Sequence, residues 1–181
     1  MICAMGIPSM HKEHARKSAA VFILTCSTSK AEQKWKGLPV EDISGDIIEK
    51  LMREAGHRII GRTLISDRLG LLRTTVRQAL KSGAEAILIT GGTGISPSDV
   101  TIESVTPLLE KELPGFGELF RKISYDAIGS AAMMTRATAG VVRGKAIFCL
   151  PGSPDGVTTA VSKLIIPELG HVLSIARQGK A

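Results

Sequence analysis

Aromatic residues are scarce in this sequence: four Phe, one Tyr and one Trp make up 3% of its 181 residues. The core must therefore be built from Ile, Leu, Val, Ala and Met, and such a core suits parallel strands buried between helices. A chain with a single Trp and a single Tyr also offers no obvious platform for stacking nucleic-acid bases. The scarcity favours an α/β domain.

Cysteines and long apolar runs are also in short supply. Cys3, Cys26 and Cys149 are widely spaced, and no Cys-x-x-Cys pair or His/Cys cluster suggests a zinc site. Cys26 and Cys149 lie inside apolar runs, so we expect buried, inert thiols in a reducing compartment. No segment approaches about 18 uninterrupted apolar residues, and residues 1–17 lack the continuous apolar stretch of a signal peptide. We expect a cytoplasmic protein that does not associate with a membrane.

Positive charge is in modest excess, with a formal net charge of +6. Such an excess favours an anionic partner, which can be a nucleotide, a phosphorylated small molecule or a nucleic acid. No run of like charge, RNA-binding aromatic motif or clear helix-turn-helix pattern is present. A small phosphorylated ligand is therefore favoured over nucleic acid.

The apolar pattern alternates between strands and helices. Apolar runs predict strands at 21–24, 59–65 and 86–89, separated by helices at 44–55 and 69–80, with a polar loop at 27–43. This order is typical of a parallel sheet with helices on both faces.

The second half of the chain adds an antiparallel edge. Strands at 139–142 and 146–150, joined through Arg143-Gly144, predict a hairpin. A final helical region is expected to stop at Pro167. We therefore predict one domain at 20–178, with a three-layer α/β/α fold and a mostly parallel sheet, after a flexible basic leader at 1–19.

The sharpest local motif is Thr90-Gly91-Gly92-Thr93-Gly94, directly after a buried strand. Its glycines leave backbone N–H groups free to approach an anion closely. The motif is neither the dinucleotide-binding fingerprint nor a P-loop. A tight turn that merely needs glycine is an equally good interpretation.

Two carboxylates, Asp67 and Asp99, follow strand ends and precede helices. Each one taken alone is a good helix cap. Because the carboxyl ends of parallel strands face one crevice, both can instead converge there with Thr101 and hold Mg²⁺ between nucleotide phosphates. The same choice between helix cap and anion site applies to Ser153-Pro154 and to Ser44-Gly45. Arg136 is a candidate phosphate contact.

Taken in order, these segments resemble the MogA/MoaB family of molybdenum-cofactor biosynthesis proteins. The motifs that carry the resemblance are Ser27-Thr28-Ser29, Asp42-x-Ser44-Gly45, Ser66-Asp67, Thr90-Gly91-Gly92-Thr93-Gly94, Asp99-Val100-Thr101, Pro114-Gly115-Phe116-Gly117-Glu118 and Pro151-Gly152-Ser153-Pro154. They extend from about Val21 to about Ala176, and the loop at Trp35-Lys36-Gly37 looks more like MoaB than MogA.

The resemblance implies a homotrimer or a hexamer, and the transfer of AMP from ATP to the terminal phosphate of molybdopterin. It assigns Asp67 and Asp99 to Mg²⁺ and nucleotide positioning. It places Ser44, Gly45, the 90–94 loop, Thr101, Arg136 and Pro151, Gly152, Ser153 and Pro154 around the substrates, with no tightly bound cofactor. A transient contact with a molybdenum-insertion protein is also implied.

One position departs from the family pattern, because Thr135 stands where a serine is expected. Threonine keeps the hydroxyl but adds a methyl group that can change the pocket. The alternative function is a non-catalytic molybdopterin-binding protein of the same pathway, since some MoaB-type members are not established as adenylyltransferases. Retention of both Asp67 and Asp99 favours the enzyme.

Overall fold

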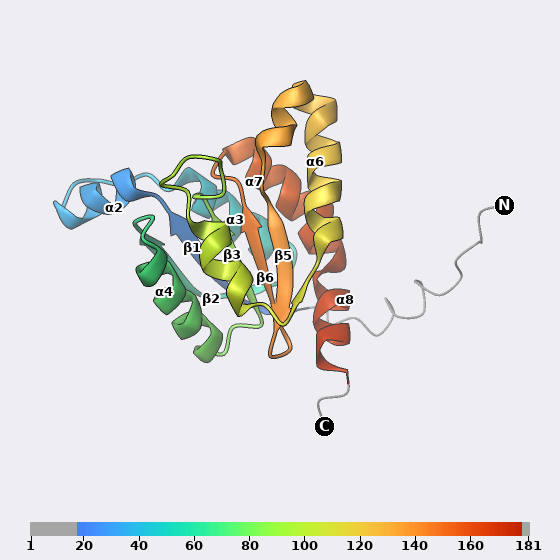
Figure 1. Ribbon diagram of the computed structural model, residues 1–181. Helices are drawn as coiled ribbons and strands as arrows, with labels where there is room; N and C mark the ends of the chain where they lie inside the picture. The colour runs from blue at the N-terminus through green and yellow to red at the C-terminus, as the bar shows by residue number, and fades with distance from the viewer. Residues whose placement is uncertain (1–17, 179–181) are drawn as a thin grey trace.

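The computed structural model describes residues 18–178, in which six strands form one sheet in the order β2-β1-β3-β6-β5-β4 (Figure 1). The strands are β1 (Ala20–Cys26), β2 (Arg58–Ile65), β3 (Ala86–Thr90), β4 (Lys111–Glu112), β5 (Thr138–Val142) and β6 (Lys145–Leu150). β2, β1, β3 and β6 run parallel, whereas β5 and β4 pair antiparallel at one edge. The predicted mixed sheet is thus confirmed.

Helices cover both faces of this sheet. One face carries α3 (Ile43–Glu54), α6 (Pro114–Ile128), α7 (Pro154–Ala160) and α8 (Ile166–Arg177), and the other carries α4 (Leu69–Lys81) and α5 (Thr101–Val105). Alternation along β1 explains the two cores, because Val21 and Ile23 face the first layer while Leu24 and Cys26 face the second. The three-layer α/β/α prediction is confirmed.

The hairpin and the buried thiols also follow the sequence. Arg143 and Gly144 join β5 to β6 with positive φ of 52° and 75°, as a tight hairpin turn requires. Cys26 and Cys149 are free and buried, and burial raises the pKa of the Cys26 thiol to about 12. The pKa of Cys149 is raised for the same reason. Both thiols are therefore protonated and unreactive at neutral pH.

Two predictions about local structure are wrong. The expected polar loop at 27–43 contains α2 (Thr28–Trp35), whose residues all remain at least partly exposed. Strong helix formers from Lys30 to Lys34 form it without any apolar stripe. The helix expected to stop at Pro167 continues, because a π-helical turn, η3 (Val161–Ile165), precedes α8 and accommodates the ring.

The remaining short elements and the N-terminal segment complete the description. η1 (Thr106–Leu108) and η2 (Gly129–Met134) flank β4 and α6. The predicted leader lies outside the described residues up to residue 17. Ala19 is buried, and Ser18 Oγ donates to the carbonyl oxygen of Gly56 at 2.8 Å.

Within residues 18–178, one helical run, Pro154–Arg177, is long and apolar enough by length and composition to cross a membrane. Val157, Val161, Leu169 and Leu173 in this run are completely buried against the sheet. Its apolar character is thus explained by the core that it covers.

Candidate active site

The glycines of the loop after β3 let it approach two other segments. Gly91 and Gly92 have positive φ of 90° and 64°, which residues with a Cβ atom rarely adopt. A Cβ atom on Gly91 would collide with the carbonyl oxygen of Cys26. One on Gly92 would lie 2.5 Å from Thr101 Oγ1 and 2.7 Å from Asp67 Oδ1. The Gly92 backbone therefore lies directly against the predicted carboxylate.

Asp67 is fixed by Thr28, the first residue of α2. Its Oδ2 accepts hydrogen bonds from the Thr28 N–H at 2.8 Å and from the Thr28 hydroxyl at 2.9 Å, and the Asp67 N–H donates to Thr28 Oγ1 at 3.0 Å. The interpretation of Asp67 as a helix cap is wrong, because Arg68 is the N-cap residue of α4 and no side chain caps it.

The other carboxylate oxygen, Asp67 Oδ1, is buried and has no hydrogen-bond partner among the described residues. A buried carboxylate oxygen without a partner is costly, so such an atom points to a ligand. It lies beside Gly92 and Thr101. This is the clearest chemical signal of a binding site in the described part of the chain.

Asp99 lies at the other end of the same loop. Its Oδ2 accepts a hydrogen bond from the Ser96 N–H at 2.9 Å, and a Cβ atom on Gly94 would lie 2.7 Å from that oxygen. Asp99 is not a helix cap either, because Val100 is the N-cap of α5. The structure thus brings both predicted carboxylates, Asp67 and Asp99, to one glycine loop.

Arg136 holds this loop in place. Its Nε donates to the carbonyl oxygens of Gly94 at 2.8 Å and of Thr93 at 3.3 Å, and its Nη1 pairs with Glu103 Oε1 at 2.5 Å. Hydrogen bonds from Arg136 hold the pKa of Glu103 below its ordinary range. The guanidinium therefore contacts protein oxygens, and its contact with a phosphate stays a prediction.

Three buried threonines tie the glycine loop to the protein. Thr90 Oγ1 donates to the carbonyl oxygen of Pro151 at 2.8 Å, and Thr93 Oγ1 donates to that of Leu150 at 3.4 Å. Thr101 Oγ1 donates to a carbonyl oxygen of the loop at 2.8 Å. These hydroxyls set the position of the loop and of the segment after β6.

Ser44 and Gly45 join α3 to that same segment. Ser44 is buried and donates to the carbonyl oxygen of Gly152 at 2.7 Å, although 108 positions separate the two residues. The N-cap of α3 is Asp42, which accepts from the Gly45 N–H at 3.1 Å and from Thr25 Oγ1 at 2.8 Å. The cap that the sequence suggested at Ser44 thus lies two residues earlier.

Arg62 on β2 is a supporting residue that the sequence analysis missed. Its guanidinium donates to Asp42 at 2.7 Å, to Asp46 at 2.6 Å and to Glu49 at 3.2 Å. Burial is the largest single influence on the pKa of Asp42 and raises it, but the hydrogen bonds from Arg62, Thr25 and the Gly45 N–H, with the charge of Arg62, together lower that pKa. The sequence offered a signal only for Asp42: it stands three residues before Gly45, which is the spacing of an N-cap residue and the amide that it accepts from.

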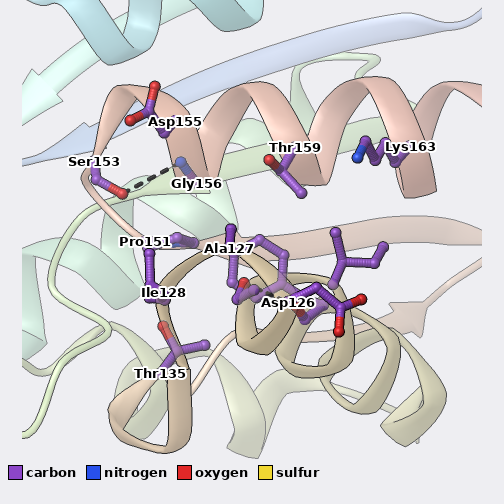
Figure 2. A pocket seen from close by; sticks show the side chains of 13 residues that line it. Asp126, Ala127, Ile128, Thr135, Pro151, Ser153, Asp155, Gly156, Thr159 and Lys163 are labelled. Carbon is purple, nitrogen blue, oxygen red and sulfur yellow. Dashed lines mark hydrogen bonds between the residues drawn. The ribbon is translucent and has the colours of Figure 1, made fainter. Parts of the chain in front are cut away.

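A cavity of about 510 Å³ opens beside residues 151–154, between α6 and the α7 helix (Figure 2). Pro151 and Ser153 line it together with Thr135, and Lys163 adds a positive charge to its wall. Ser153 Oγ accepts a hydrogen bond from the Gly156 N–H at 3.3 Å, which confirms its interpretation as a helix cap.

The other predicted residues face different spaces. Asp99 and Arg136 line a cavity of about 350 Å³ together with residues 95–97. Thr28 and the two neighbours of Asp67 line a third cavity, of about 400 Å³. The predicted residues therefore lie on neighbouring loops that several cavities adjoin, and we call these loops the loop cluster. Pro151 and Ser153 line a cavity that neither Asp67 nor Asp99 lines.

The fold and these loops define a class: a doubly wound α/β protein whose candidate site lies beyond the carboxyl ends of its parallel strands. Within that class, residues 22–171 match the family model described as "Probable molybdopterin binding domain". The chain belongs to this family.

Individual relatives extend over nearly the whole chain. Molybdenum cofactor biosynthesis protein B of Bacillus subtilis strain 168 is 42% identical over 172 residues, which are 94% of this chain and 97% of the relative. Molybdopterin adenylyltransferase of Pyrococcus furiosus is 38% identical over 178 residues, which are 96% of this chain and 100% of the relative. A crystal structure of molybdenum cofactor biosynthesis protein B is 40% identical, with a TM-score of 0.82 over 91% of this chain and 99% of that one.

Proposed function

We propose that this protein is a molybdopterin adenylyltransferase of molybdenum cofactor biosynthesis. The oxygen of the terminal phosphate of molybdopterin forms a bond to the α-phosphorus of ATP, the bond between the α- and β-phosphates breaks, and pyrophosphate leaves. Adenylyl-molybdopterin is the product. Membership of the molybdopterin-binding family and the relative that bears the name molybdopterin adenylyltransferase support this reaction.

The observation that carries the proposal is the unpartnered Oδ1 of Asp67 beside Gly92. A phosphate monoester is largely ionised at neutral pH, since its second pKa is about 6. The nucleophile therefore needs no general base, and the barrier comes from bringing two anions together. A site for this reaction must neutralise charge and align the reacting groups.

Asp67 and Asp99, which lie beside Gly92 and Gly94 of the same loop, would hold a Mg²⁺ ion together with substrate phosphates. Among residues 18–178 no three His, Cys, Asp or Glu side chains gather into a metal cage. A cage is not needed, because Mg²⁺ is usually held by one or two carboxylates while phosphates and water complete its shell. Bound Mg²⁺ would supply neutralisation of the phosphate charge. Asp67 Oδ1 is the atom best placed to ligate it.

The other predicted residues orient the substrates. The Gly91 N–H donates to the carbonyl oxygen of Leu150 at 3.2 Å and so helps to anchor the loop. The amides of Gly92 and Gly94 would add dipoles toward the phosphates, and Thr90, Thr93 and Thr101 keep that loop in place. Pro151 and Ser153 line the larger cavity, in which Thr135 contributes a hydroxyl and an extra methyl group. Ser44, followed by Gly45 in α3, supports that segment through its hydrogen bond to Gly152. Arg136 holds the loop between Gly94 and Asp99.

The proposal extends to the setting of the protein. We place it in the cytoplasm as a homotrimer or a hexamer, without a tightly bound cofactor and without a nucleic-acid or membrane partner. The product then passes in a transient contact to a molybdenum-insertion protein.

The test measures pyrophosphate release from molybdopterin, ATP and Mg²⁺ by the wild type, by Asp67→Asn, by Asp99→Asn and by an Asp67→Ala, Asp99→Ala double variant. Loss of a group that stabilises charge in the transition state costs about 10²–10³ in kcat. Glu112→Gln is the control, because Glu112 is an exposed carboxylate on the edge strand β4.

The outcomes separate the function from the site. If the Asp67→Asn variant loses turnover and the Glu112→Gln variant retains it, both the proposed reaction and the proposed site are supported. Turnover that survives in the double variant leaves the enzyme but refutes the two-carboxylate site. Molybdopterin binding without ATP binding or turnover would identify a non-catalytic pterin-binding protein instead.

A further inference from the structure

A pocket of about 400 Å³ lies between α2 and the turn that carries Asp67. It is lined by Thr28, Ala31, Glu32 and Trp35 from α2, and by Ser66 and Arg68 from the turn. The four α2 residues follow the spacing i, i+3, i+4 and i+7, so they form one face of the helix. Figure 1 shows α2 projecting away from the sheet near the end of β1.

Trp35 is the unusual member of this face. It is the only tryptophan in the sequence, and 86% of it is exposed. Arg68, across the pocket, is exposed as well. An exposed indole opposite a cation, beside an acceptor such as Glu32, suits a planar, polar-edged ligand attached to an anion.

Thr28 connects this pocket to the proposed phosphate site. Thr28 lines the pocket and also holds Asp67 through two hydrogen bonds. Trp35 lies seven residues further on, which is about 10 Å along a helix. A nucleotide whose phosphates reach Asp67 can therefore place its base against Trp35, with the ribose between them.

We propose that this pocket holds the adenine base of ATP, stacked on the indole of Trp35. Glu32 accepts a hydrogen bond from the exocyclic amino group of adenine. This inference rests on the proposed AMP transfer, because that reaction is what requires ATP at the site.

Because Trp35 is the only tryptophan, its fluorescence reports on this pocket alone. Titration with MgATP should quench the emission to saturation. Magnesium tripolyphosphate, which has the phosphates but no base, should leave the emission unchanged. Calorimetry of the same titrations gives the affinities.

Variants test the contact directly. Trp35→Ala should weaken ATP binding by about 5- to 150-fold, the range expected for loss of one base–aromatic stack. Trp35→Phe should restore most of the affinity. Tyr125→Ala is the control, because Tyr125 is 63% exposed on α6 and does not line this pocket.

Three results would overturn the inference. If calorimetry shows that ATP binds, but Trp35 emission does not change and Trp35→Ala binds ATP with the same affinity, then the base lies elsewhere and the proposed AMP transfer still stands. If Trp35 emits like a buried indole in concentrated protein and like an exposed indole after dilution, a second copy of the chain covers this face. Absence of ATP binding by the wild type removes the proposed function together with the pocket.

Discussion

Replacement of Arg62 by Leu should destabilise the protein strongly, because three carboxylates share this guanidinium. Only 12% of the Asp42 side chain and 25% of the Arg62 side chain are exposed. Breaking a fully buried ion pair costs about 3–5 kcal/mol, and an exposed pair contributes about 1 kcal/mol or less. We therefore expect a loss of about 2–4 kcal/mol, or about 5–15 °C in Tm for a chain of this length.

The loss should depend on pH. The pKa of Asp42 is lowered from 3.8 in the folded protein, where burial opposes ionisation but hydrogen bonds from Arg62 and Thr25 outweigh it. Its carboxylate therefore stabilises the fold above about pH 4, and the stabilisation is lost as the pH falls through its folded-state pKa. The effect of Arg62→Leu should be full at neutral pH and shrink below about pH 4.

Thermal denaturation at one fixed protein concentration measures both effects, since self-association would otherwise shift Tm. The control is Arg53→Leu, which removes an exposed i,i+4 pair with Glu49 and should cost at most about 0.5 kcal/mol. A double-mutant cycle with Asp42→Asn gives the coupling of the pair. A loss below about 1 kcal/mol, the ceiling for an exposed pair, or an equal loss at acidic and neutral pH would refute the reasoning.

Three further changes test the loop cluster. Gly92→Ala should abolish AMP transfer and lower the free energy of unfolding by about 1–3 kcal/mol, because the residue has positive φ and its Cβ would contact Asp67 and Thr101. The control is Gly70→Ala, in open space on α4, which should leave activity and Tm nearly unchanged. Equal effects of the two substitutions would contradict this account. Thr28→Val should raise the Mg²⁺ concentration needed for half-maximal activity, since the hydroxyl orients Asp67, and Thr28→Ser should restore it; an unchanged Mg²⁺ requirement would speak against that role. Ser44→Ala should lower stability by about 0.5–1.5 kcal/mol, measured by denaturant unfolding, because the buried Ser44 hydroxyl no longer donates to the carbonyl oxygen of Gly152. A neutral result would show that water replaces the hydroxyl.

The sequence by itself determined the architecture of this protein. The strands at β1, β3 and β6 are short, continuous apolar runs, and the helices between them carry apolar stripes, so local periodicity alone specifies each element and its buried face. Arg143-Gly144 likewise predicts a hairpin, because Gly144 accepts the positive φ that the turn requires. The resemblance to the MogA/MoaB family supplied the residues of the candidate site, because a set of motifs in a fixed order is specific even where each motif alone is ambiguous.

Only the tertiary structure decided what those residues contact. Asp67 and Asp99 each fit a helix cap in sequence, yet Asp67 pairs with Thr28 and Asp99 with its own loop. The α2 helix has no buried apolar stripe from which the sequence could have predicted it. Pro167 is accommodated within a helix because a π-helical turn precedes it. For Asp67, the physical reason is that its partner Thr28 lies 39 positions away in the chain, so local patterns do not reveal the contact. The bond from Ser44 to Gly152, for example, exists only once α3 and the segment after β6 have packed together.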